Sequence, residues 1–254
     1  MTIQEYYKEF TTKVSSNINM SLADNDSCIA MIAKNSSFVE DYNIWVNILD
    51  ERLESVIFKN AIKTYQESLS NMVMGLYQPA FMGLRYFLER TLMGVYMSAN
   101  ELELRTWLAE GRDTYWSELI GEDNEDKVTG TDNTQGKAVN VNKGLFSSKY
   151  TQAFNSSLIG RTKEFRALTK TVYRNCSIYV HGNSSVLEEL GQKIEYSKDL
   201  ATKWNDYADT ISRCILYAFY LRYYPILSDE AKRRVSDRLR EEFSTISEIN
   251  DYLV

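Results

Sequence analysis

Two side chains suited to acid–base and phosphate chemistry lie seven residues apart in the last third of the chain. His181 is the only histidine among the 254 residues, and Arg174 precedes it in a segment with helical periodicity. On one helix, seven residues make nearly two turns and a rise of about 10.5 Å, so both side chains leave the same face. An imidazole transfers protons near neutral pH, and a guanidinium binds phosphate oxygens in a bidentate manner. The pair therefore suits phosphodiester cleavage in RNA, where the neighbouring 2′-hydroxyl is the nucleophile and no metal is required.

A helix over residues 163 to 181 places further cations on the face of Arg174 and His181. Lys163, Arg166 and Lys170 fall within about 80° of these two residues on a helical wheel. The opposite side is apolar and consists of Phe165, Leu168, Val172, Cys176 and Tyr179. A solvated charged face with an incidental histidine is the plain alternative. The uniqueness of the histidine and the all-cationic stripe in an acidic protein favour a functional face.

The segment from Arg174 through Asn175 to His181 resembles the signature of HEPN-type ribonucleases. That signature is an arginine, four to six residues of which the first is commonly polar, and a histidine, on a helix of an all-α bundle. The resemblance covers residues 53 to 224. It implies a metal-independent endoribonuclease of the toxin–antitoxin or antiphage-defence type that leaves a 2′,3′-cyclic phosphate. In that interpretation His181 is the general base or acid, Arg174 stabilises the developing charge, and Asn175 supports them.

The stretch from Met72 to Glu89 is similar to the first helix pair of many HEPN proteins, in which an arginine and a glutamate interrupt an apolar helix. Arg85 and Glu89 stand four residues apart. The functional hypothesis is that one of them orients Arg174 or His181. The alternative is a simple intrahelical ion pair.

A single histidine predicts that the active site needs two chains. Transesterification uses one group to remove a proton and another to protonate the leaving oxygen. A two-fold homodimer would bring two copies of Arg174 and His181 into one cleft, with the 163 to 181 helices facing each other. RNA is then the expected substrate, guided by Lys163, Arg166 and Lys170, and a cognate antitoxin, sensor or other defence protein is a possible partner. The alternative from another functional class is a non-catalytic HEPN-like module that binds a partner protein or RNA.

Composition favours an all-α helical bundle. The chain has two prolines and 11 glycines, and 44% of its residues are hydrophobic. It shows no signal-peptide pattern and no uninterrupted apolar stretch of bilayer length, so we expect a cytoplasmic protein that does not contact the membrane. The three cysteines have no short spacing, which argues against disulfides and a metal site, and no cofactor is implied. A net charge of −6 excludes a general nucleic-acid coating protein and leaves room for a local basic surface.

Periodicity and turn residues predict one all-helical domain of three parts. Residues 1 to 52 form an N-terminal helical extension, 53 to 224 the HEPN-like core, and 225 to 254 a C-terminal helix. Expected helices span about 3 to 19, 37 to 58, 53 to 76, 79 to 98, 101 to 120, 146 onward, 161 to 181, 196 to 224 and 229 to 248. The polar insertion 121 to 144 has no aromatic residue and is expected to be mobile.

Two other patterns have a plain structural explanation. The aromatic run from Tyr217 to Tyr224 offers base-stacking surfaces, but its helical spacing favours core or a dimer interface. Cys176 and His181 are a possible nucleophile and base, yet they point to opposite faces of the predicted helix.

Overall fold

The protein is all-helical in the computed structural model, which describes residues 1–23, 27–111, 116–121, 144–182 and 184–254. No strand occurs in these ranges. The α-helices are α1 (Ile3–Ala23), α2 (Ser27–Ile48), α3 (Ser55–Val73), α4 (Tyr77–Met97), α5 (Glu101–Glu110), α6 (Trp116–Ile120), α7 (Ser148–Phe154), α8 (Thr162–His181), α9 (Ser184–Leu190), α10 (Lys198–Tyr223), α11 (Asp229–Phe243) and α12 (Ser247–Asn250), with 3₁₀ turns η1 (Ser156–Arg161) and η2 (Tyr224–Ile226). The expected all-α class is confirmed. None of these helices is both long and apolar enough to cross a bilayer.

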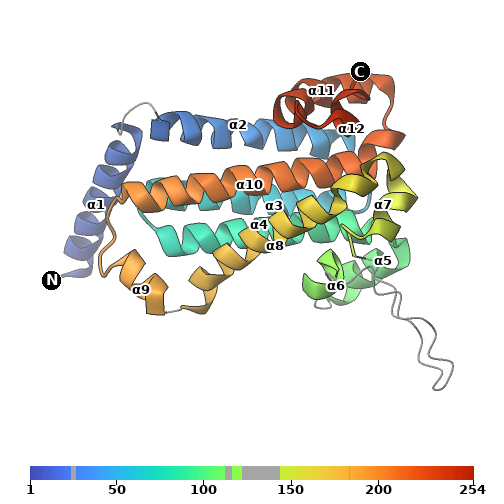
Figure 1. The fold of residues 1–254 in the computed structure, drawn as a ribbon. Coiled ribbons are helices and arrows are strands. Elements are labelled where there is room, and N and C mark those ends of the chain that lie inside the picture. The colour runs from blue at the N-terminus through green and yellow to red at the C-terminus, as the bar shows by residue number, and fades with distance from the viewer. Residues whose placement is uncertain (24–26, 112–115, 122–143, 183) are drawn as a thin grey trace.

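Helix α10 is the centre of the bundle. Figure 1 shows it running the length of the molecule between α2 on one side and α4 and α8 on the other. Its C-terminal half is buried on every side, so the aromatic run from Tyr217 to Tyr224 is core. Base stacking and a dimer interface are therefore both excluded for this run, and its rings pack on neighbouring helices.

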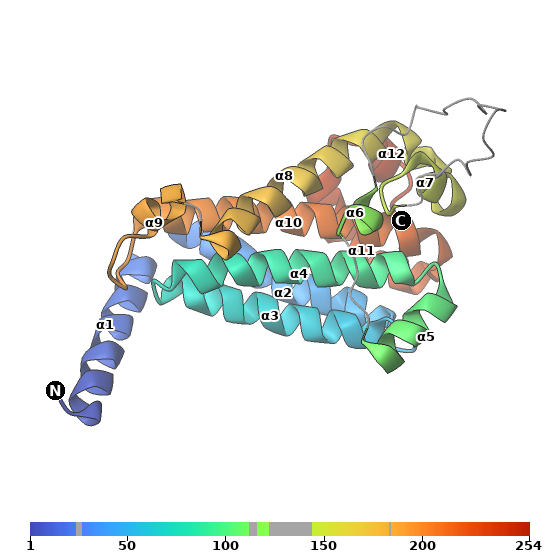
Figure 2. The same cartoon turned by 90° about the horizontal axis from the view of Figure 1, so that it is seen from below.

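Helices α3 and α4 form a close antiparallel pair beside α10 (Figure 2). Two glycines of α4 permit the short distance between the helix axes. A Cβ atom on Gly94 would lie 2.6 Å from the ring of Phe58, and one on Gly83 would lie 2.7 Å from Cβ of Ser68. The predicted helix pair is thus present, with its boundaries shifted by one to three residues.

The prediction of a helix over 37 to 58 was wrong in its boundaries. The chain leaves the helical path after Ile48 and turns before α3 begins at Ser55. The turn is closed by the hydrogen bonds from Arg52 N to Leu49 O and from Ser55 Oγ to Asp50 O. This turn contains no glycine or proline, so the sequence shows no break in the helical pattern there. Smaller corrections fall at Gly111, where a φ of +65° ends α5, and at Phe243, where α11 ends before 248.

The polar insertion leaves and re-enters the fold at one point. Leu145 N donates to Leu119 O at 2.8 Å, and a Cβ on Gly144 would lie 2.3 Å from Gly121 N. Glycine is required at residue 144 because the two backbones approach so closely. The prediction of a mobile segment over 121 to 144 falls almost wholly on residues 122 to 143, which lie outside the described part of the chain.

Candidate functional site

Helix α8 carries the candidate site and is held to the bundle by ring stacking at both ends. The ring of Phe165 stacks on that of Tyr217 with centroids 3.6 Å apart, and Tyr179 stacks on Phe81 at 3.9 Å. The helix ends at His181 because Gly182 takes a left-handed conformation with φ +64°. These contacts fix the orientation of the outward face of α8.

Arg174 and His181 both lie exposed on that outward face. Neither side chain makes a hydrogen bond or an ion pair within the described part of the chain. Asn175 is half-buried beside Arg174 on the flank of the helix. The side chains of Arg174 and His181 are therefore accessible to a ligand. About two helical turns separate the two residues along α8.

The basic stripe is narrower than the sequence predicts. Lys163 is exposed and Lys170 half-exposed, and both have interactions of their own within the fold. Arg166, however, is only 3% exposed, so its expected place on an RNA-guiding surface was wrong. Because α8 packs against both α4 and α10, its buried arc is wide and includes Arg166. A helical wheel cannot reveal how many neighbours cover a helix.

Arg85 and Glu89 reach neither Arg174 nor His181 through any contact among the described residues. The Arg85 guanidinium donates from Nη2 to the Tyr173 hydroxyl at 2.6 Å, and its carbon lies 4.8 Å from the centroid of the Tyr173 ring. Its distance to Glu89 is 3.8 Å, the intrahelical pair that the spacing allowed. Arg85 thus supports α8 through Tyr173, the residue before Arg174, and has no contact with the end of the helix that carries His181.

Tyr173 and Trp116 are site-adjacent residues that the sequence did not single out. Their rings stack with centroids 3.6 Å apart and an interplanar angle of 7°. Trp116 belongs to the short helix α6, which lies between α5 and the polar insertion in the chain. Only the tertiary fold brings α6 against α8, so no sequence pattern identifies the pair. Together with Arg85, these rings fix the flank of α8 beside Arg174.

The turn that follows His181 is held by a second set of residues that the sequence did not single out: Tyr179, Glu189 and Lys203. The Tyr179 hydroxyl donates to Glu189 of α9 at 3.0 Å, and Glu189 also pairs with Lys203 of α10. Burial, together with this carboxylate, raises the pKa of Tyr179 above its usual range, so the hydroxyl remains a donor. These three residues connect α8, α9 and α10, and Tyr179 lies two residues before His181.

Cys176 is unsuited to nucleophilic catalysis. It is fully buried, and desolvation raises its pKa to about 12, although Arg85 nearby lowers the pKa in part. A thiol with this pKa is almost wholly protonated near neutral pH. The geometry agrees, because Cys176 points into the bundle and His181 points out. A cysteine–histidine mechanism at this site is therefore excluded.

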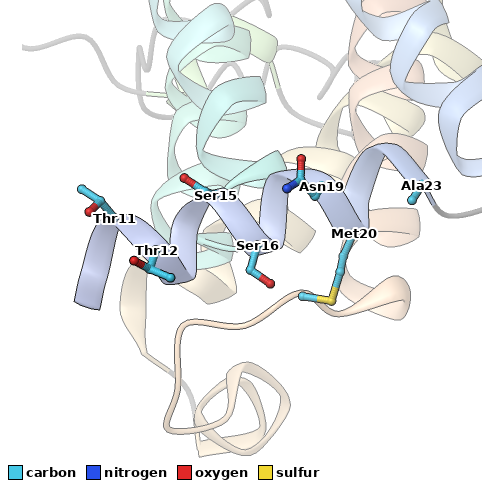
Figure 3. Close-up of a pocket in the computed structure, with 7 residues that line it drawn as sticks. All are labelled: Thr11, Thr12, Ser15, Ser16, Asn19, Met20 and Ala23. Carbon is cyan, nitrogen blue, oxygen red and sulfur yellow. The ribbon is translucent and has the colours of Figure 1, made fainter. Parts of the chain in front are cut away.

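Two hollows among the described residues lie away from Arg174 and His181. One of about 640 Å³ is lined by seven small or uncharged residues of α1 (Figure 3): Thr11, Thr12, Ser15, Ser16, Asn19, Met20 and Ala23. Figure 3 shows them along a single helix, with no titratable side chain among them. The other, of about 520 Å³, lies among α3, α4, α5 and α6 and includes Glu89, Trp107 and Trp116. Arg174 and His181 line neither hollow, and the described residues contain no group of His, Cys, Asp and Glu that would hold a metal ion.

Comparison with known proteins does not assign this site, because the chain matches no protein-family model, no curated protein and no solved structure. A functional assignment therefore depends on the residues and geometry of the chain itself.

Proposed function

We propose that this chain is a metal-independent endoribonuclease of the HEPN type that acts in the cytoplasm, in antiphage defence or in a toxin–antitoxin system. The observation that carries the proposal is that the side chains of Arg174 and His181 are exposed and have no polar partner among the described residues. Both are exposed on one face of a firmly packed helix, and neither side chain forms a hydrogen bond or an ion pair within the described residues. Cationic and imidazole side chains left free on one rigid face are suited to a bound phosphate.

The proposed reaction is a transesterification within RNA. An imidazole takes the proton of the 2′-hydroxyl, the O2′ atom attacks phosphorus, and the bond to the 5′-oxygen breaks as that oxygen receives a proton. The products are a 2′,3′-cyclic phosphate and a 5′-hydroxyl. Arg174 stabilises the charge on the phosphoryl oxygens, and Asn175 supports the site. Lys163 and Lys170 remain candidates to guide the strand, while the buried Arg166 does not.

A two-fold homodimer completes this proposal. One chain supplies one imidazole, whereas the reaction benefits from both a base and an acid. Arg174 and His181 are exposed on the outward face of α8, so a phosphate bound there on one chain would be open to solvent. A second α8 across a two-fold axis would supply another His181 and Arg174 and enclose the scissile phosphate.

A non-catalytic module that binds RNA or a partner protein through the same face is the second candidate. It is favoured by one observation: Arg85 contacts Tyr173 and Glu89, and no hydrogen bond or ion pair within the described residues orients the His181 imidazole. A binding face needs accessible cations but no oriented imidazole.

Incubation of the purified full chain with total RNA in excess EDTA separates the two candidates. We expect cleavage to continue in EDTA at a rate close to that in Mg²⁺, because no step needs a metal ion. The new 3′ ends should carry a cyclic phosphate, detected by their resistance to ligation until the ring is opened and the remaining phosphate is removed by a phosphatase. Intact RNA from several sources, together with measurable RNA or protein binding, would favour the non-catalytic module.

The two-fold arrangement has its own test in Thr171→Cys, an exposed residue one turn before Arg174. We expect a short bismaleimide to join two chains through this residue, because the α8 helices face each other. All three native cysteines are buried and should not react. The matched control is Arg233→Cys on the exposed side of α11, which should not cross-link. A monomer by light scattering that still cuts RNA at full rate would overturn the arrangement.

A further inference from the structure

The N-terminal half of α1 projects beyond the end of the bundle (Figure 2). Of the 21 residues of α1, only Asn17 and Ser21 are buried, and both lie in its second half. No apolar side chain of α1 belongs to the buried core, which begins at Cys28. An amphipathic helix that leaves its apolar side in water is unusual in a folded protein and marks an interaction surface.

The second half of α1 is fixed to the bundle by polar contacts. Asn17 Nδ2 donates to Met74 O at 3.0 Å, and Asn17 Oδ1 accepts from Tyr196 N at 3.1 Å. Ser21 Oγ donates to Val73 O at 3.1 Å. These bonds hold α1 against the turn between α3 and α4, so the direction of the whole helix is set.

The first half of α1 is a well-formed helix up to its start. Thr2 and Glu5 form a reciprocal capping box: Glu5 N donates to Thr2 Oγ1 at 3.2 Å, and Thr2 N donates to a Glu5 carboxylate oxygen at 2.6 Å. A continuous helix anchored at one end cannot bend its other end back onto the bundle. The apolar residues of the first half are therefore exposed or only partly covered by the described bundle.

These residues follow the spacing of a coiled-coil seam. Its positions alternate by four and three residues: Ile3, Tyr7, Phe10, Val14, Asn17 and Ser21. The last two are the polar anchors on the chain's own bundle, and the first four are apolar. Ile3 is 66% exposed and Tyr7 is 58% exposed, while Phe10 and Val14 are partly covered. Four successive seam residues are thus available for pairing.

The charges of α1 favour a second copy of the same helix over a lipid surface. Glu5, Lys8 and Glu9 lie away from the seam, and Lys13 is the only charged residue that flanks its apolar part. Two acidic and two basic residues leave this half of the helix without the positive charge that attracts anionic lipids. No like charges would face each other across a pair of these helices.

We propose that the seam Ile3, Tyr7, Phe10 and Val14 pairs antiparallel with the same seam of a second copy of this chain. Antiparallel order places the two anchored ends, and hence the two bundles, at opposite ends of the pair. In the symmetric register Tyr7 packs on the partner's Phe10 and Ile3 packs on the partner's Val14, with Tyr6 beside the partner's Lys13. This pairing does not depend on the proposed nuclease activity.

Phe10→Glu tests the pairing in the full chain. We expect light scattering and sedimentation to show a smaller assembly, or a dissociation constant at least tenfold weaker, because the glutamate would sit in the apolar seam. The matched control is Thr12→Glu on the exposed outer side of the same turn, which should leave the assembly unchanged. Circular dichroism and thermal unfolding check that both variants remain folded, as expected for residues outside the core.

Cysteine pairs test the register. A mixture of Tyr7→Cys chains and Phe10→Cys chains should form an interchain disulfide on mild oxidation, whereas neither variant alone should do so. Cross-linking of Tyr7→Cys to itself would indicate a parallel pair and overturn the proposal. Absence of the mixed disulfide, or an assembly unaffected by Phe10→Glu, would also overturn it and leave a different protein as the occupant of the seam.

Discussion

Replacing either Arg174 or His181 with alanine is expected to lower the RNA cleavage rate by about 10²- to 10⁴-fold. Loss of His181 removes proton transfer to or from the reacting oxygens, and loss of Arg174 removes a charge that stabilises the transition state. Both side chains are exposed and form no hydrogen bond or ion pair within the described residues, so their removal should cost little stability. Cleavage of a labelled RNA under single-turnover conditions, beside a thermal unfolding curve, measures the two effects separately.

Arg233→Ala is the matched control, because it removes an exposed guanidinium on α11, outside the helix that carries the site. Its cleavage rate should stay within about twofold of the unchanged protein, since a surface truncation away from the site usually changes little. Arg174→Lys should recover only part of the activity because an ammonium lacks the bidentate donors of a guanidinium. Undiminished cleavage by His181→Ala would refute the assignment of the histidine.

Phe219→Ala is expected to reduce the free energy of unfolding by about 3–5 kcal/mol, the usual cost of truncating a buried phenylalanine to alanine. The ring is fully buried in α10, and its centroid lies 5.2 to 5.4 Å from those of Phe58, Tyr42 and Trp45. It thereby joins α10 to α2 and α3 at one point. Urea unfolding followed by tryptophan fluorescence or circular dichroism measures the loss.

Two controls identify the cause of that loss. Phe219→Leu keeps most of the volume and should cost less than Phe219→Ala, because a smaller cavity remains. Leu102→Ala removes an apolar side chain that is 77% exposed and should change the free energy of unfolding by less than about 0.5 kcal/mol. Similar losses for Phe219→Ala and Leu102→Ala would show that the aromatic cluster is not the centre of stability.

The sequence by itself determined the all-α class and the existence of most helices, because these features depend on local periodicity and on the scarcity of glycine and proline. Helices α4, α8 and α10 lie within about three residues of their predicted limits. The outward direction of Arg174 and His181 also followed from spacing, since residues seven apart on a helix share a face. The internal turn before Ser55 did not, because its hydrogen bonds come from residues that carry no turn signal.

Packing between helices decided the rest, because it depends on residues far apart in the chain. The burial of Arg166, the stack of Trp116 on Tyr173, and the pairing of Arg85 with Tyr173 all arise where α8 meets other helices. The aromatic run of α10 became core for the same reason, since neighbours cover it on every side. The seam of α1 shows the converse: its heptad spacing is readable in the sequence, but only the tertiary structure shows that Asn17 and Ser21 fix the helix so that its apolar half remains uncovered.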